Sequence, residues 1–110
     1  MPSILEVVEG LREQGSDERL AYSITTTEWG SSPTSPTLVA YDESGYTDVT
    51  SAGGSTGSGV YPSGSPSVSG DKILLPLLRD LQPGHTYRIE IKFTIGSNVW
   101  EGHFRVKCLR

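Results

Sequence analysis

Two neighbouring segments near the end of the chain alternate strictly between apolar and polar residues. The first, HTYRIEIKFTI (85–95), has an aromatic or aliphatic side chain at every second position. The second, VWEGHFRVKC (99–108), repeats the pattern after the turn-forming GSN (96–98). Successive side chains of a strand point to opposite faces, so this period predicts an antiparallel hairpin with one buried face. The residues predicted to face the core are Tyr87, Ile89, Ile91, Phe93, Ile95, Trp100, Phe104, Val106 and Cys108.

Shorter segments of similar character precede this hairpin. LAYSITTT (20–27), TLVAYD (37–42), YTDVTS (46–51) and KILLPLL (72–78) are predicted strands, separated by sequences rich in Gly, Ser, Pro and Asp. Proline cannot donate to a ladder, so Pro76 predicts that its strand lies at a sheet edge or ends there. Six or seven short strands in one small domain predict an all-β fold, an antiparallel sandwich.

The N-terminal segment has a different pattern. In SILEVVEGLREQ (3–14), Ser3 and Glu6 fit a capping box, and the apolar residues Leu5, Val8 and Leu11 recur at helical spacing. This predicts a short amphipathic helix within an arm of residues 1–16, ahead of a β-sandwich domain of residues 17–110. Two interpretations remain open: the helix packs on its own domain, or it docks on a neighbouring subunit.

A Gly/Ser-rich segment, TSAGGSTGSGVYPSGSPSVSGD (50–71), fills a fifth of the chain. Such a composition contributes little to a core, so we expect a loop that contacts other proteins through its free backbone groups. Deletion of residues 52–70 is therefore expected to leave the fold intact and to weaken assembly. Together with the N-terminal arm, the predicted partner-binding residues are Leu5, Val8, Leu11, Tyr46, Gly54, Gly57, Val60 and Tyr61.

Charge and hydropathy exclude several classes of function. The 110 residues carry a formal net charge of −4, which argues against nucleic acid as a partner. No apolar run approaches the roughly 18 residues that a membrane span requires. Residues 1–15 lack the basic start of a signal peptide, so we expect synthesis in the cytoplasm. The single cysteine, Cys108, excludes an internal disulfide and is predicted to be a small buried hydrophobe.

Chemistry-bearing motifs are scarce. His85 and His103 have no cysteine or acidic residue at metal-binding spacing, which favours ordinary surface residues. Asp42, Glu43 and Asp48 flank one turn where calcium could bind, but a solvated acidic turn is the preferred interpretation. The chain also lacks a nucleophile elbow and a complete phosphate-binding loop. We therefore expect no enzyme activity, no cofactor and no metal.

The segment LRDLQPGHTYRIEIKF (78–93) resembles the corner before the sixth strand of immunoglobulin-like and fibronectin-III-like domains. The matching residues are Leu81, Pro83, Gly84 and Tyr87. The resemblance implies that the Tyr87 hydroxyl bonds to backbone a few residues upstream and that Leu81 lies in the core beneath it.

A wider resemblance covers residues 17–108. Small virion proteins of tailed bacteriophages, including fibre–tail adaptor proteins, are similar at Asp17, Glu18, Leu20, Tyr22, Ile24, Trp29, Gly84, Tyr87 and the terminal hairpin. The resemblance implies a non-enzymatic structural protein located in the virion, as a capsid decoration, neck or tail-fibre adaptor. It would be multimeric in the particle and bind other virion proteins of capsid, neck or tail. The alternative is a carbohydrate-binding or adhesin-type module that uses exposed aromatic residues, Trp29, Tyr46 and Tyr61, as its platform.

Overall fold

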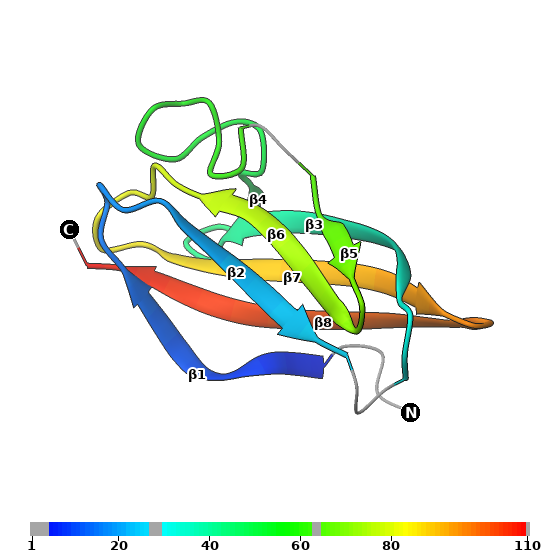
Figure 1. Ribbon diagram of the computed structural model, residues 1–110. Coiled ribbons are helices and arrows are strands. Elements are labelled where there is room, and N and C mark those ends of the chain that lie inside the picture. The colour runs from blue at the N-terminus through cyan, green and yellow to red at the C-terminus, as the bar shows by residue number, and fades with distance from the viewer. Residues whose placement is uncertain (1–4, 27–29, 63–64, 110) are drawn as a thin grey trace.

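The computed structural model describes residues 5–26, 30–62 and 65–109, with the backbone alone for residues 5–12 (Figure 1). Every regular element in these ranges is a strand. The strands are β1 (Leu5–Gln14), β2 (Leu20–Thr25), β3 (Thr34–Asp42), β4 (Thr47–Asp48), β5 (Ser67–Ser69), β6 (Lys72–Leu78), β7 (Thr86–Ile95) and β8 (Asn98–Cys108).

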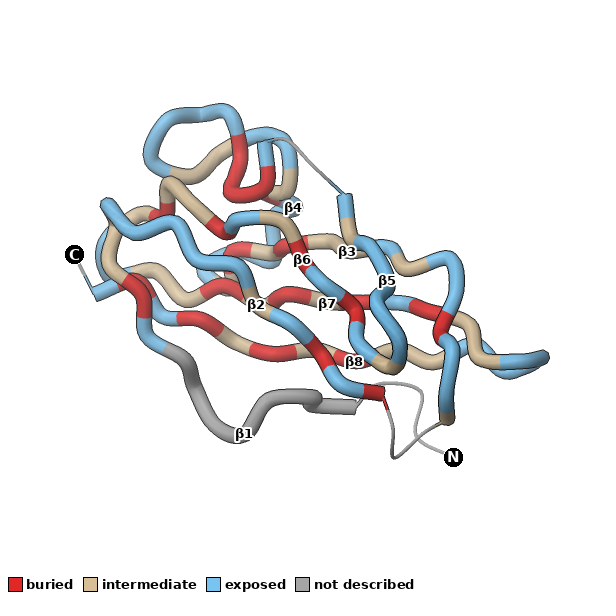
Figure 2. Tube along the Cα trace, in the orientation of Figure 1, coloured by how far each residue is buried: buried red, intermediate tan, exposed pale blue. Residues whose placement is uncertain are grey.

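The strands form two sheets. One has the order β1-β8-β7-β3-β4 and the other the order β2-β6-β5. All neighbours pair antiparallel except β1 and β8, which run parallel. Figure 2 shows buried positions at intervals along strands of both sheets, as expected where two sheets share one core. The predicted all-β, sandwich-like architecture is confirmed at this level.

The terminal hairpin is the centre of the larger sheet. β7 and β8 pair without a register shift from Thr86↔Lys107 to Ile95↔Asn98. Seven of the nine residues predicted to face the core are at most 1% exposed, and Ile95 and Trp100 are partly buried against the same cluster. Each large apolar side chain buried in this way contributes about 1.5–3 kcal/mol. This gain explains why strict alternation correctly predicted the buried face of the hairpin.

The predicted N-terminal helix is wrong. Residues 5–14 form β1, which pairs parallel with β8 from Leu5↔Gly102 to Gln14↔Cys108, with a register shift between Glu6 and Leu11. Without β1, strand β8 would be a long edge with a row of unpaired backbone groups. A helix this short has little stability of its own, whereas the pairing with β8 also satisfies backbone groups of β8 that would otherwise lie at an open edge. The segment therefore packs on its own domain.

Pro76 lies inside β6, the central strand of the smaller sheet, so the predicted edge position is wrong, whereas the predicted alternative, that the strand ends near the proline, agrees with its end at Leu78. β5 pairs only as far as Leu74, so it does not reach the proline. On the other side the β2 register shifts between Ala21 and Ser23, opposite the proline. The bulge interrupts the pairing with β2, and β5 ends before this position. The N–H that proline lacks is therefore not needed for a ladder hydrogen bond on either side.

The connection from β6 to β7 crosses between the sheets at a buried corner. Leu81 is 0% exposed, and the Tyr87 hydroxyl accepts a hydrogen bond from the Gln82 N–H at 2.8 Å. Gly84, with φ +83°, makes the turn, and its N–H donates to the Cys108 carbonyl at 2.9 Å. These bonds tie the corner both to itself and to the end of β8.

Candidate functional site

The Gly/Ser-rich segment contributes two residues to the core of the domain. Val60 is 0% and Tyr61 is 4% exposed, and both belong to the core cluster. Their N–H groups donate to the carbonyls of Val49 and Thr50, and the Val60 carbonyl accepts from the Arg79 N–H. The expectation that this segment adds little to the core is therefore wrong at these two residues. In this structure their side chains face the protein's own interior and not a partner.

Glycine serves this segment by allowing close contact between chains. Gly59 has φ +94°, and a Cβ there would lie 2.4 Å from the Thr50 carbonyl oxygen. A Cβ on Gly54 would lie 2.7 Å from the Asp80 carbonyl oxygen, which also accepts from the Ser55 N–H. Gly57, by contrast, has open space around it. The tip of the loop, residues 55–58, is exposed throughout, as are residues 51, 52, 62, 65 and 67–70 of the same segment.

The remaining predicted contact residues are scattered. Tyr46 lies in the turn between β3 and β4, with φ +52° and 62% of its surface exposed. Leu5, Val8 and Leu11 lie on β1, where the structure describes the backbone only. β1 is the edge of the larger sheet opposite to β4, and the loop follows β4 (Figure 1). The N-terminal segment and the loop therefore do not form one surface. Trp29 lies outside the described residues.

Tyr61 carries a buried hydroxyl that has no hydrogen-bond partner among the described residues. Burial, reinforced by the nearby Tyr22, raises the pKa of the Tyr61 phenol above its ordinary value. Burial also raises the pKa of Tyr87, against the opposing effect of the bond from Gln82, with smaller contributions from Asp42 and Cys108. The two phenols therefore differ in one respect. The Tyr87 hydroxyl has a hydrogen-bond partner, and the Tyr61 hydroxyl has none among the described residues.

Removing each hydroxyl should separate these two situations. Tyr87→Phe leaves the Gln82 N–H without its acceptor and is expected to destabilise the fold by about 1–3 kcal/mol. Tyr61→Phe removes a polar group that is buried without compensation, so it should be neutral or stabilising by about 1 kcal/mol. Urea unfolding at neutral pH measures both. Equal destabilisation by the two substitutions would contradict this account.

Alkaline pH should destabilise the protein through the same phenols. A pKa that is higher in the folded state means that stability is fully present below about pH 10, the unfolded value, and falls above it. Each such phenol adds a slope of at most about 1.4 kcal/mol per pH unit. Urea unfolding series above pH 10 should show a shallower decline in Tyr61→Phe than in the wild type. An unchanged slope would show that Tyr61 already ionises freely in the folded state.

The turn after β3 holds its acidic residues by direct bonds. Oδ2 of Asp42 lies 2.7 Å from Nδ1 of His85, and Oδ1 accepts from the Ser44 N–H at 3.0 Å. Arg105 donates to both oxygens of Glu43 at 2.8 and 2.9 Å. Oδ1 of Asp48 accepts from the Thr50 N–H. The described residues contain no group of three or more potential metal ligands, so the turn is held by hydrogen bonds and ion pairs.

His85, predicted to be an ordinary surface residue, lies partly exposed in the turn before β7. Its side chain is 35% exposed, bound to Asp42, and stacked beside Tyr87 with ring centroids 6.4 Å apart. Burial alone would raise the pKa of Asp42, but the bonds from Ser44 and His85 outweigh it and lower this pKa. The two residues are 43 positions apart. To predict this contact from the sequence, one would have needed the register that pairs Asp42 with Tyr87.

Neutralising Asp42 tests this pair. Because the pKa of Asp42 is lower in the folded state, its contribution is present at neutral pH and is lost as pH falls below about 3.8. Asp42→Asn should therefore cost about 1–3 kcal/mol at pH 7, and the difference from wild type should shrink toward pH 2–3. Urea unfolding across this range measures it, with the exposed Asp48→Asn as the control. A difference that stays constant with pH would show that the carboxylate charge is irrelevant.

The outer face of β3, β7 and β8 is charged. Arg88 donates to Glu90 at 2.7 Å, and one Arg88 nitrogen lies 3.5 Å from Nδ1 of His103. A half-open hollow of about 260 Å³ lies on these strands. It is lined by Thr37, Val39, Glu90, Ile91, Lys92, Glu101 and Gly102. The lining contains two carboxylates and one ammonium group, but no imidazole and no thiol. Cys108 is 0% exposed, as predicted.

A scan against protein-family models and searches of curated proteins and of solved structures found no match to this chain. Within the described residues there is no helix with the length and hydrophobicity needed to cross a membrane.

Proposed function

We propose that this chain is an immunoglobulin-like, fibronectin-III-like structural protein of a tailed-phage virion, without enzymatic activity. The observation that carries the domain type is the strand order combined with the corner. Immunoglobulin-like domains place the first, second, fifth and fourth strands in one sheet and the third, sixth and seventh in the other. Here β2, β6 and β5 form one sheet, and β3, β7 and β8 share the other, which differs from that order in also containing β1 and the short β4. Tyr87 bonds to Gln82 at the crossing into β7.

The virion role rests on the resemblance over residues 17–108 and on how the loop is held. The tip at residues 55–58 is exposed, yet the Ser55 N–H is fixed to Asp80 and the Gly53 N–H to the Gly57 carbonyl. A pre-ordered tip loses little conformational entropy on contact. Many copies in a particle make weak contacts of this kind sufficient. The partners would be capsid, neck or tail proteins, reached through this tip, Tyr46 and the N-terminal segment.

Mass spectrometry of purified particles tests the proposal. Phage particles from the strain that carries the gene are purified by density, digested with trypsin and compared with the cell lysate. We expect the peptide FTIGSNVWEGHFR (93–105) to be enriched in the particles. Finding the peptide in the lysate but not in particles that contain capsid and tail peptides would overturn the virion assignment.

A carbohydrate-binding module is the second candidate, favoured by the 62% exposed ring of Tyr46. Tyr61 is buried and cannot belong to a stacking platform. A glycan array on the wild type and on Tyr46→Ala separates the candidates, since sugar binding that depends on this ring is expected only of the module.

A further inference from the structure

The edge strands of the two sheets differ in how they are protected against pairing with another chain. β4 has two residues and β5 has three, and such short edges offer little to pair with. β1 is long, but its sequence, LEVVEGLREQ, contains four charged residues. β2 has six residues, LAYSIT, with neither a charge nor a proline. Of the edges that the structure describes, β2 alone combines length with the absence of these protections.

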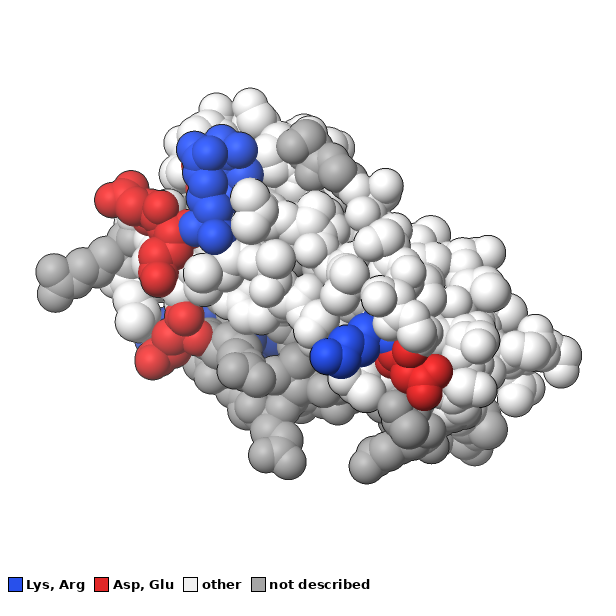
Figure 3. All heavy atoms as spheres, in the orientation of Figure 1, with Lys and Arg blue, Asp and Glu red and all other residues white. Residues whose placement is uncertain are grey.

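The sheet that ends in β2 also has an uncharged outer face. Ala21, Ser23 and Thr25 are exposed on β2, and Leu74 and Leu77 are 40% and 46% exposed on β6. Among the residues of β2, β5 and β6, only Lys72 is charged. Figure 3 shows uncharged atoms over the middle of this face, with charged side chains toward its ends. Natural sheets usually place charges on such an edge and face when both stay in water.

We propose that β2 pairs antiparallel with β2 of a second copy of this chain, which joins the two small sheets into one continuous sheet of six strands. The chain carries a net charge of −4, so contact between copies is least opposed where the surface has no charge. Antiparallel pairing of a strand with its own copy is two-fold symmetric and closes, so it gives a dimer and not a filament.

β2 can pair with β2 of the second copy in a register that places the outer faces of the two strands on the same side. With the two-fold axis at Ser23, the two Ser23 residues lie opposite each other and Ala21 lies opposite Thr25 of the second copy. These side chains are small, so no bulky groups collide on the outer face. Tyr22 then lies opposite Ile24, on the face that is turned to the core in each copy.

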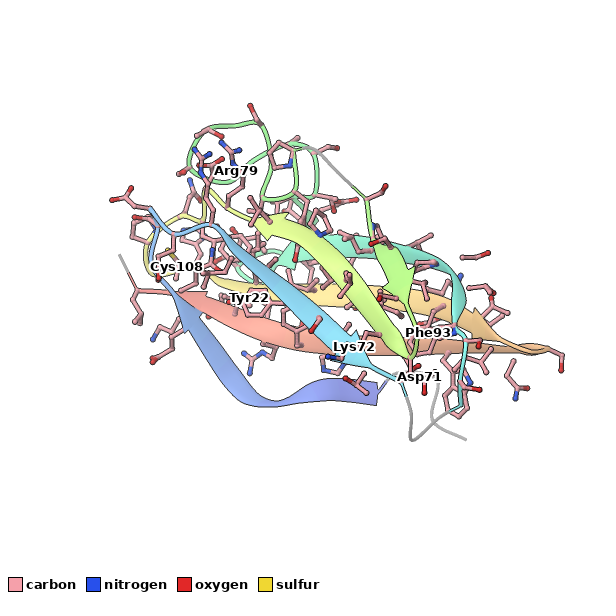
Figure 4. The ribbon with its side chains drawn as sticks, viewed as in Figure 1. Tyr22, Asp71, Lys72, Arg79, Phe93 and Cys108 are labelled. Atoms are coloured by element: carbon pink, nitrogen blue, oxygen red, sulfur yellow. The ribbon has the colours of Figure 1, made fainter. Side chains whose placement is uncertain are left out.

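Charges of both signs lie at each end of the strand. Lys72 is exposed and pairs with Thr25, the last residue of β2, and Asp71 precedes Lys72 in the chain, whereas the exposed Asp17, Glu18 and Arg19 precede the first residue of β2. Figure 4 shows Lys72 at the end of β6 that is distant from Arg79. An antiparallel pair brings Lys72 of each copy to the end where the acidic residues of the other copy lie. Because each end carries both signs, the pairing does not set charges of one sign alone against each other.

Sedimentation of the intact chain tests the dimer. We expect wild-type protein to have twice the chain mass of 11.9 kDa, with dissociation on dilution. Ser23→Lys places two ammonium groups against each other at the axis and should raise the dissociation constant at least about tenfold. Ser67→Lys is the matched control, because Ser67 is exposed on β5 at the opposite edge of the same sheet. It should leave the dimer unchanged, and circular dichroism confirms that both variants are folded.

A cysteine pair gives a second, independent measurement. Opposite residues of an antiparallel pair have Cβ atoms about 4.5–5.5 Å apart, close to what a disulfide needs. Mild oxidation should link Ser23→Cys into a covalent dimer and leave Ser67→Cys monomeric, with the buried Cys108 common to both. If the wild-type protein is monomeric, the proposal is wrong, and the β2 edge is then open to a strand from another protein. A dimer that Ser67→Lys weakens as much as Ser23→Lys overturns it too. Neither result depends on whether the chain belongs to a virion.

Discussion

Gly59→Ala is expected to destabilise the domain by about 3 kcal/mol or more, a larger effect than the same change at Gly53, Gly54 or Gly57 of this loop. Gly59 has φ +94°, a conformation that L side chains rarely adopt. A Cβ there would lie 2.4 Å from the Thr50 oxygen, 2.6 Å from Ser51 Cα and 2.7 Å from the Ala52 nitrogen. All three are backbone atoms, so no side chain can rotate away. Relief requires moving the segment that positions Val60 and Tyr61 in the core.

Gly57→Ala provides the matched control. Gly57 has φ +84°, so it shares the conformational strain, but a Cβ there would meet nothing within 4 Å. It should cost only the strain of about 1–2 kcal/mol that a left-handed backbone imposes on alanine. Thermal and urea unfolding of the two variants isolate the clash as their difference. Equal losses of stability would mean that the loop moves freely around Gly59, against the geometry described above.

The parts of the fold that could be predicted from the sequence are those in which one residue pattern admits one structure. Strict alternation across 85–95 and 99–108 fixed both the hairpin and its inward face. The corner could be anticipated too, because Leu81, Gly84 and Tyr87 resemble the corner of immunoglobulin-like domains.

Other parts depended on competition that a local pattern does not reveal. Residues 3–14 satisfy the rules for a short helix, yet residues 5–14 pair with β8, whose edge would otherwise be open. The pair of Asp42 and His85 depends on the register between β3 and β7, which residue types alone do not determine. The β2 edge becomes visible as a possible contact only when the strand order shows that β1 joins the other sheet.

The Gly/Ser-rich segment shows how composition misleads when a few residues differ from the average. Its glycines and serines indicate a solvated loop, and residues 55–58 are indeed exposed. Val60 and Tyr61 nevertheless enter the core, where they lie alongside Val49 and Thr50, the residues that follow β4. Bonds between consecutive N–H groups and the carbonyls of Val49 and Thr50 hold them there. Two apolar residues in a polar segment are therefore better interpreted as an anchor than as an exposed contact.

Deletion of residues 52–70 is consequently expected to abolish cooperative unfolding, which reverses the expectation from composition. The deletion removes Val60 and Tyr61 from the core, a loss on the order of 5 kcal/mol by analogy with large-to-small core substitutions. It also removes β5, which pairs with β6. A domain of this size has a total stability of only about 5–15 kcal/mol, so the loss is comparable to the whole.

Point substitutions show whether the anchor or the length of the loop is responsible. Val60→Ala with Tyr61→Ala should reproduce most of the loss, because it empties the same core volume at full loop length. Thr56→Ala with Ser58→Ala, at the exposed tip, should change stability by less than about 0.5 kcal/mol. Calorimetry of the deletion variant and the two double variants ranks their losses of stability directly. If the deletion variant unfolds cooperatively at the wild-type midpoint, Val60 and Tyr61 do not anchor the core, and the segment is the free appendage that its composition indicates.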